Sequence, residues 1–303
     1  MAILNARRRN PSVRHYDSLG SRVFDVANTL VLLFLVAITL LPLLYVLAGS
    51  FASEGEIDSR SFFLWPERFV TDAYDYMFAG DTFIRALLTT IMVTLVGTLV
   101  QVGLTLTMAY PLSKRHLPGR VLFINLVLFT LVFSGGMVPT YLVVRELGLL
   151  DSYWALILPL AINPFYLLIV KSFFQELPEA LEEAARIDGC NELQVFWRIV
   201  LPLSKPVIAT FSLFYAVAIW NDYMSPLLYI NDEKKWTLQV LVRQLTAPNA
   251  DSANMLGTQS SASFPEQGLK FAVIVLATVP ILLVYPFLQK HFAKGVLIGS
   301  VKE

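Results

Sequence analysis

Charged side chains are scarce in this 303-residue chain. Asp, Glu, Lys and Arg make up 15% of its residues, whereas about 25% is usual in a soluble domain. Basic and acidic residues are equally numerous, at 23 each, so net charge indicates no particular partner. The single cysteine, Cys190, excludes an internal disulfide and any CxxC motif. The composition therefore excludes a disordered chain, a nucleic-acid-binding protein and a disulfide-rich secreted domain.

Motifs of nucleotide hydrolysis and of common hydrolytic enzymes are absent as well. The sequence contains no G-x-x-x-x-G-K-[ST] phosphate-binding loop, no G-x-S-x-G nucleophile elbow and no H-E-x-x-H zinc helix. The histidines His15, His116 and His291 lie far apart in the chain, and solvated or interfacial side chains explain them better than a metal site. We therefore expect no catalytic residue, metal or cofactor in this chain.

Long uncharged hydrophobic stretches dominate instead. Hydrophobic types make up 56% of the residues, and the mean hydropathy is +0.61. About 20 apolar residues form a helix that crosses a bilayer, and a helix satisfies its own backbone hydrogen bonds there. We predict an all-α membrane protein whose transmembrane domain covers residues 24–290. Its six predicted transmembrane helices lie at about 24–50, 86–112, 121–145, 152–171, 206–230 and 271–290.

Basic residues are distributed unevenly between the two sides of these spans. With the N-terminus inside, the inner segments hold 15 Lys and Arg residues and the outer segments hold 8. The positive-inside rule therefore predicts a multi-pass protein of the bacterial cytoplasmic membrane with both termini in the cytoplasm. Residues 1–23 and 291–303 would be cytoplasmic tails, and residues 172–205 would be a cytoplasmic loop.

Three positions within the predicted spans carry unusual residues. Small residues at Ser134–Gly136 permit close helix packing, which we favour over an ion-coordinating break. Proline at Asn163–Pro164 predicts a kink, because it removes a backbone donor. Asp222 is the one charged residue away from the ends of the predicted spans, and it indicates either a substrate path or an interfacial anchor near the outer helix end.

The stretch around Asp222 is our candidate for the translocation path. An amide, a carboxylate and aromatic faces are groups that bind sugars, and Asn221, Asp222 and Tyr223 supply them. Consecutive helical residues point about 100° apart, so these side chains cannot all line one cavity. We expect Asn221 and Asp222 to face inward, because their exposure to lipid is costly.

The cytoplasmic loop 172–205 predicts a helix–turn–helix. Pro178 is tolerated at the start of a helix, acidic residues follow it in the first turns, and Gly189 can end that helix. A second amphipathic helix at roughly 191–200 would precede Pro202. The length of the loop and its apolar residues favour a docking surface for a soluble partner over a solvated connection.

The same loop carries a recognisable motif. Glu183-Ala184-Ala185, Gly189, Ile199 and Leu201-Pro202 match the E-A-A-x₃-G-x₉-I-x-L-P motif of binding-protein-dependent ABC importer permeases. Cys190 stands where alanine or serine is usual. Phe133–Tyr141, Trp220–Asp222 and Gly295–Lys302 extend the likeness, so that the chain resembles the MalG-like carbohydrate branch, and within it the LplC-type permeases.

This resemblance implies a type I ABC importer fold with several partners. They are a second, MalF-like or LplB-type permease subunit, two ATPase subunits that bind ATP and Mg, an extracytoplasmic solute-binding protein and a sugar substrate. The motif residues would form the coupling helix that docks on the ATPase, with Glu183 as an ion-pair partner. Gly299, Ser300 and Lys302 would contact the ATPase through the C-terminal tail.

The resemblance leaves the sugar open between a neutral oligosaccharide and a uronide. A self-contained secondary transporter or channel is the alternative. Inverted repeats and ionisable clusters near the bilayer midplane are common in such carriers, and the sequence shows neither.

Overall fold

The structure is a computed structural model that describes residues 19–247, 255–256 and 266–300, with side chains described as far as Leu283. These described ranges contain helices and connecting segments and no strand. The helices, in chain order, are α1 (Leu19–Ser50), α2 (Glu54–Ser59), α3 (Asp72–Ala79), α4 (Asp81–Ser113), α5 (Arg120–Val132), α6 (Met137–Glu146), α7 (Trp154–Ile157), α8 (Pro164–Glu176), α9 (Glu179–Ile187), α10 (Glu192–Val195), a π-helical turn (Phe196–Val200), α11 (Leu201–Leu203), α12 (Lys205–Asn221), α13 (Met224–Tyr229), a 3₁₀ turn (Glu233–Lys235), α14 (Leu238–Leu245) and α16 (Glu266–Ser300).

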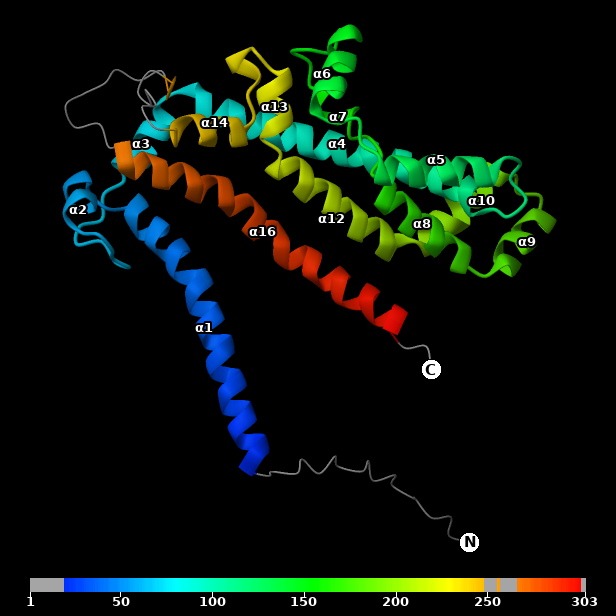
Figure 1. The fold of residues 1–303 in the computed structure, drawn as a ribbon, viewed down its shortest axis with the longest axis horizontal. Helices are drawn as coiled ribbons and strands as arrows, with labels where there is room; N and C mark the ends of the chain where they lie inside the picture. The colour runs from blue at the N-terminus through cyan, green and yellow to red at the C-terminus, as the bar shows by residue number, and fades with distance from the viewer. Residues whose placement is uncertain (1–18, 248–254, 257–265, 301–303) are drawn as a thin grey trace.

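The long helix α4 is the axis of the bundle (Figure 1). Near one end of α4, Phe83 packs with α14 and α16, and in its middle Val93 packs with α7 and α13. Toward its C-terminal end, Leu106 and Ala109 pack against α8, α12 and the segment from α10 to α11. The helices α9 and α10 lie at the end of the molecule opposite α2 and α3 (Figure 1). Three apolar clusters along one helix therefore hold most of the other elements in place.

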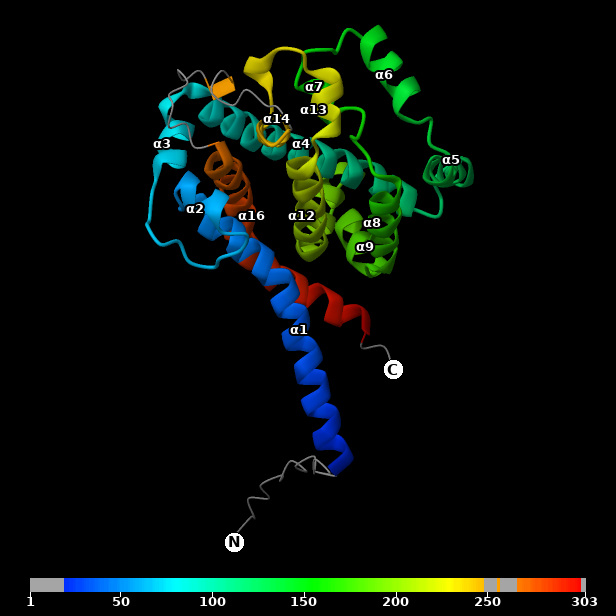
Figure 2. The ribbon, with the colours of Figure 1, turned by 60° about the vertical axis from the view of Figure 1, so that its left-hand side comes forward.

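The helix α1 leaves this bundle at an angle and contacts it through its C-terminal turns (Figures 1 and 2). There Gly49 lies so close to α16 that an added Cβ would stand 2.5 Å from the Phe271 ring, and Tyr45 meets that ring edge-on at 5.5 Å. The earlier side chains of α1 are apolar and exposed, among them Phe24 and Phe34. Such a surface is suited to lipid or to another membrane subunit and not to water.

Helices that are long and apolar enough to cross a membrane occur at three of the predicted positions. Within the described residues they are Gly20–Ser50, Asp81–Ser113 and Glu266–Leu283, and two further pairs of helices qualify if each bent pair counts as one span. Two of these helices correspond to the predicted spans at 24–50 and 86–112. The third is the beginning of α16, which continues to Ser300 and so extends into the segment predicted to be a C-terminal tail.

The other three predicted spans contain breaks between helices, and their crossing of the membrane stays a prediction. Within 121–145, α5 and α6 are bent by 117° at a break, where Gly136 has φ +84°. Within 152–171, α7 and α8 are separated at Leu158–Asn163, and within 206–230, α12 ends at Asn221 before α13 begins. In both views α6, α7 and α13 lie on one side of α4 (Figures 1 and 2), where α13 contacts α6 and α7.

Candidate functional site

The loop between α8 and α12 folds as the predicted helix–turn–helix. Helix α9 starts directly after Pro178, and Gly189 with φ +86° follows its end. The amides of Gly189 and Cys190 donate to the carbonyls of Arg186 and Ala185, at 3.0 and 2.9 Å, which is the Schellman arrangement that glycine favours. On the other side of the turn, Asn191 and Gln194 form a capping box at the start of α10. The predicted ends of the first helix are therefore confirmed.

The second helix of the loop differs from the prediction, because it does not end before Pro202. It continues through a π-helical turn into α11, which contains Pro202, and then bends by 81° at Ser204 into α12. In the π-helical turn the amide of Leu201 donates to the carbonyl of Phe196, five residues back. The change of pitch comes just before the position where proline lacks a donor. The loop therefore runs into α12 through a bent but nearly continuous helical path.

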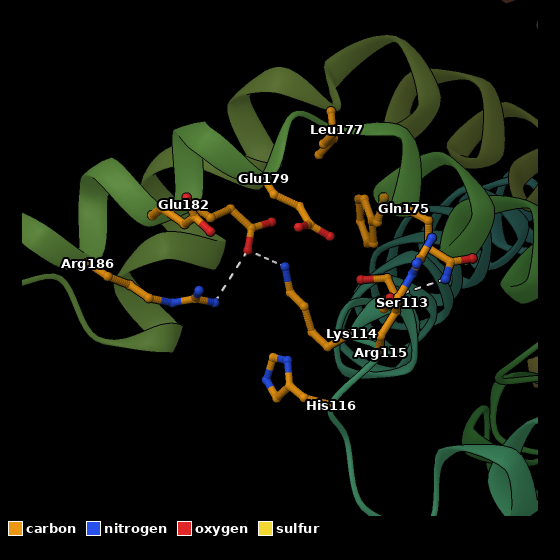
Figure 3. A pocket seen from close by; sticks show the side chains of 11 residues that line it. Ser113, Lys114, Arg115, His116, Gln175, Leu177, Glu179, Glu182 and Arg186 are labelled. Carbon is orange, nitrogen blue, oxygen red and sulfur yellow. Dashed lines mark hydrogen bonds and ion pairs between the residues drawn. The ribbon is translucent and has the colours of Figure 1, made fainter.

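A cluster of charged side chains joins this loop to the end of α4 (Figure 3). Lys114, the C-terminal cap of α4, and Arg186 both form ion pairs with Glu182, the latter at 3.6 Å. Arg186 also donates to Glu192 on α10 at 2.9 Å, and the Tyr110 hydroxyl donates to the same carboxylate at 3.3 Å. The hydrogen bond from Arg186 lowers the pKa of the Glu192 carboxyl.

The burial of this cluster distinguishes it from a surface ion pair. The side chains of Lys114 and Glu182 are 17% and 8% exposed. Both line a pocket that the end of α4 shares with α8 and α9 (Figure 3). The sequence analysis missed this pair, because 68 positions separate its members and no short motif links them. The one local pattern around Glu182 is Arg186, which follows four residues later on the same helix, at the spacing of an ion pair.

The residues of the E-A-A motif divide between the surface and the interior of the loop. Glu183, Ala184, Gly189 and Pro202 are exposed. The other three, Ala185, Ile199 and Leu201, pack in or against the cluster of buried residues at the C-terminal end of α4. Beside the exposed residues, Ile187 is 86% exposed. The outer face of α9 therefore combines small, acidic and apolar side chains, and the docking role of the motif stays a prediction.

Hydrogen bonds with side chains of α4 and α12 fix both sides of the break between α7 and α8. At the start of α8, the amide of Asn163 donates to the Tyr215 hydroxyl of α12 at 3.0 Å. That hydroxyl lies 2.8 Å from the Thr105 hydroxyl of α4, which donates to the carbonyl of Gln101 at 2.7 Å. At the end of α7, the Gln101 side chain donates to the carbonyl of Ile157 at 3.5 Å. Gln101 and Thr105, about one turn apart on α4, are thus connected by hydrogen bonds to both sides of the break.

The predicted kink at Asn163–Pro164 is therefore the start of a new helix. The Asn163 side chain accepts from the amides of Phe165 and Tyr166, at 3.0 and 3.2 Å, and caps α8. Pro164 occupies the first turn of α8, where its missing N–H leaves no hydrogen bond unmade.

The candidate path residues lie at the end of α12. The carboxylate of Asp222 accepts from the amides of Met224 and Ser225, at 3.0 and 3.1 Å, and so caps α13. The Asn221 side chain donates to the carbonyl of Val217 at 2.8 Å and is exposed, and Tyr223 is exposed as well. The structure therefore gives Asp222 a capping role, while the assignment of the three residues to a sugar path stays a prediction.

Comparison with known proteins identifies the family. Residues 6–298 match the family described as the binding-protein-dependent transport system inner membrane component. The chain belongs to this family. The predicted family is thus confirmed, and with it the multi-pass membrane location.

Two relatives and one solved structure resemble this permease over most of its length. It is 62% identical to the protein LplC of Bacillus subtilis (strain 168), over 95% of this chain and 97% of that protein. It is 54% identical to the polygalacturonan/rhamnogalacturonan transport system permease protein YtcP of the same organism, over 94% and 100%. A crystal structure of a bacterial ABC transporter involved in the import of the acidic polysaccharide alginate has a chain that is 31% identical, with a TM-score of 0.84 over 91% of this chain and 98% of that chain. This similarity confirms the predicted type I importer fold.

A second cluster in this permease was not predicted and lies between the α6–α7 connection and the segment after α13. Asp151 has φ +57°, a conformation that Asp tolerates better than most residues. Its carboxylate accepts from the amides of Asn231 and Asp232, at 2.6 and 3.0 Å, and its carbonyl accepts from Lys235 at 2.8 Å. The amides of Asp232 and Asn231 lower the pKa of the Asp151 carboxyl. The cluster joins segments 80 residues apart, which no local pattern reveals.

The residues predicted to contact the ATPase through the C-terminal tail lie beyond the described side chains. Gly299 and Ser300 are the last residues of α16, and their side chains lie beyond the described ones. Lys302 lies outside the described residues. The contact therefore stays a prediction.

The ion pair between α4 and the loop should have a measurable coupling energy. We expect a double-mutant cycle of Lys114→Met and Glu182→Gln to give a coupling energy of about 1 to 3 kcal/mol, because both side chains are largely removed from water. Unfolding of the purified complex measures it. The exposed pair Arg145–Glu146 is the control, since exposed pairs contribute about 0.2 to 1 kcal/mol. Equal coupling energies in the two cycles would contradict the proposed strength of the buried pair.

The Tyr215 hydroxyl should stabilise the permease measurably. Tyr215→Phe removes the acceptor for Asn163 and the partner of Thr105, and a buried donor left without a partner costs about 1 to 3 kcal/mol. We expect the free energy of unfolding of the purified complex to fall by that amount. In the control variant, Tyr153→Phe, the lost hydroxyl makes no hydrogen bond to the described residues, so little change should follow. A similar loss in both variants would show that the hydrogen-bond network is not the cause.

Proposed function

We propose that this chain is one of two permease subunits of an ATP-binding-cassette importer that carries an oligosaccharide across the cytoplasmic membrane. The helix–turn–helix between α8 and α12, with its motif, supports a role in coupling to ATPase subunits. The membership of the family and the names of the relatives support the transport of a carbohydrate. The energy would come from ATP and Mg bound by the two partner ATPases, while an extracytoplasmic binding protein delivers the sugar.

The substrate that we propose is an oligosaccharide with uronic acid units. YtcP is named for polygalacturonan and rhamnogalacturonan transport, and the similar structure belongs to a transporter of the acidic polysaccharide alginate. The segments predicted to lie outside hold 13 acidic and 8 basic residues, which gives this subunit no electrostatic attraction for such a sugar. Selection of the sugar would therefore rest mainly with the binding protein.

The contacts of the loop support a coupling step. Closure of the ATPase dimer would move α9 and α10 together, because the cluster around Glu182 and Arg186 joins them. Two routes would carry this motion into the membrane: the ion pair with Lys114 on α4, and the bent helical path through Pro202 into α12. The spans would then change between inward-facing and outward-facing states. Such coupling requires that each partner bind the two states with different affinity.

A reconstituted complex tests the transport function. The complete importer in liposomes, with its binding protein added, is supplied with trigalacturonate, maltotriose or arabinotriose. We expect trigalacturonate to stimulate ATP hydrolysis several-fold and to enter the vesicles, and the neutral sugars to do neither. Stimulation by a neutral sugar alone would refute the acidic substrate. Sugar uptake by this chain without the ATPases would refute the importer itself.

Variants of the loop test its coupling role in the same assay. Gly189→Val forces a β-branched residue into a left-handed conformation, whereas Gly189→Asn fits it, and an added Cβ at this position meets no atom within 4 Å. We expect Gly189→Val to lose sugar-stimulated ATP hydrolysis and Gly189→Asn to keep most of it.

A charge reversal at Glu183 provides an independent measurement. We expect Glu183→Lys to reduce stimulated hydrolysis at least tenfold with basal hydrolysis unchanged, because the exposed carboxylate is the proposed partner of a basic ATPase residue. Glu146→Lys, a reversal at an exposed side chain far from the loop, is the control. Full stimulation in the Glu183 and Gly189→Val variants would remove the coupling assignment.

A further inference from the structure

The segment between α7 and α8 leaves several backbone polar groups without partners. Leu158 and Ala161 use their amides, which donate to the carbonyls of Trp154 and Leu158 at 2.9 and 3.1 Å. The amides of Leu160 and Ile162 have no hydrogen-bond partner among the described residues. The same holds for the carbonyls of Pro159, Leu160, Ala161 and Ile162. The four consecutive residues Pro159–Ile162 therefore carry two unpaired backbone donors and four unpaired backbone acceptors.

The depth of this segment makes the unpaired groups significant. Helix α8 ends in the loop 172–205, the proposed coupling loop, which is predicted to lie in the cytoplasm. The membrane part of α8 then runs from Pro164 to Lys171, about 12 Å at 1.5 Å per residue. A bilayer has a hydrocarbon core of about 30 Å. The segment Leu158–Ile162 therefore lies inside the core, near its middle.

Lipid cannot surround backbone groups of this kind. Each unsatisfied group in hydrocarbon costs several kcal/mol, so non-helical backbone at this depth must be buried in protein or must line a water-filled cavity. One edge of the segment is fixed to α4 and α12 through Gln101 and Tyr215. Its other edge is open in this chain, where the side chains of Leu158 and Leu160 are 44% and 55% exposed.

We propose that Leu158–Ile162 lines the sugar-translocation path and that its free amides and carbonyls hydrogen-bond sugar hydroxyl groups. This inference rests on the proposed function, because it names the part of this subunit that touches the sugar. A sugar hydroxyl both donates and accepts, so it pairs with either kind of backbone group. A neutral hydrogen bond of this type makes only a small net contribution, because it replaces a hydrogen bond to water, and the sugar can therefore move on. The exposed Trp154, one helical turn before Leu158, offers an apolar face beside the same segment.

Reaction of introduced cysteines with a hydrophilic thiol reagent tests the exposure of this segment to water. In the full complex carrying Cys190→Ser, which removes the native thiol, Leu160→Cys and Leu158→Cys are each treated with a methanethiosulfonate that bears a trimethylammonium group. The matched control is Leu99→Cys, because Leu99 is 75% exposed on the uninterrupted helix α4. We expect at least one of the two segment positions to react tenfold or more faster than the control, in one or both nucleotide states. Reaction of both positions no faster than the control would place the segment against lipid or the partner permease and overturn the proposal.

Protection by the sugar tests the contact itself. The binding protein is loaded with whichever sugar of the panel stimulates ATP hydrolysis in the wild-type complex, and a non-hydrolysable ATP analogue holds the complex together. We expect the reaction of the segment cysteine to slow at least fivefold compared with the same mixture without sugar. Unchanged labelling despite normal stimulation of the wild type would overturn the sugar contact and leave the proposed function intact. Absence of stimulation by every sugar would instead refute the proposed function.

Discussion

In hydrocarbon every backbone polar group needs a hydrogen-bond partner. This requirement determines how the permease is built. Three of its membrane segments are interrupted, and each interruption releases amides and carbonyls that water cannot reach from the lipid side. Helix α4 contributes partners at one of these interruptions, where Gln101 donates to the carbonyl of Ile157 and Thr105 contacts the Tyr215 hydroxyl that accepts from Asn163. It also fixes the start of α14, because Thr90 accepts from the amide of Leu238 at 2.7 Å. An uninterrupted helix thus stabilises its broken neighbours.

The same helix also connects the interruptions to the coupling loop. Its last residues carry Tyr110 and Lys114, which contact Glu192 and Glu182 of the loop, and two turns earlier Thr105 contacts Tyr215 of α12. Helix α12 in turn follows the loop directly through the bend at Ser204. The loop is therefore connected to the α7–α8 break through α4 and α12, which pack together and share the hydrogen-bonded pair Thr105–Tyr215.

Residue patterns predicted some parts of this arrangement and failed for others, for definable reasons. Hydrophobic length located the helices at 24–50 and 86–112, and Pro178 and Gly189 predicted the ends of α9 because proline and glycine act locally. Hydropathy does not distinguish a continuous helix from two helices with an apolar break, so the interruptions at Gly136, Leu158–Asn163 and Asp222 were missed or reduced to a kink. The pairs Lys114–Glu182 and Asp151–Asn231 depend on tertiary packing, which a single sequence does not encode as a pattern.

The distribution of charge along the molecule is consistent with passage of a sugar that must not be held tightly. Charged clusters occur at the coupling loop, around Glu182, and at the opposite ends of the broken spans, around Asp151 and Lys235. Between them, the groups that the described residues offer at the α7–α8 break are neutral amides, carbonyls and hydroxyls. A buried ionic site would bind an acidic sugar strongly and release it slowly, whereas neutral groups exchange readily with water. In the proposed mechanism, selectivity resides in the binding protein, and this subunit provides a polar route that opens and closes with the motion of α4 and α12.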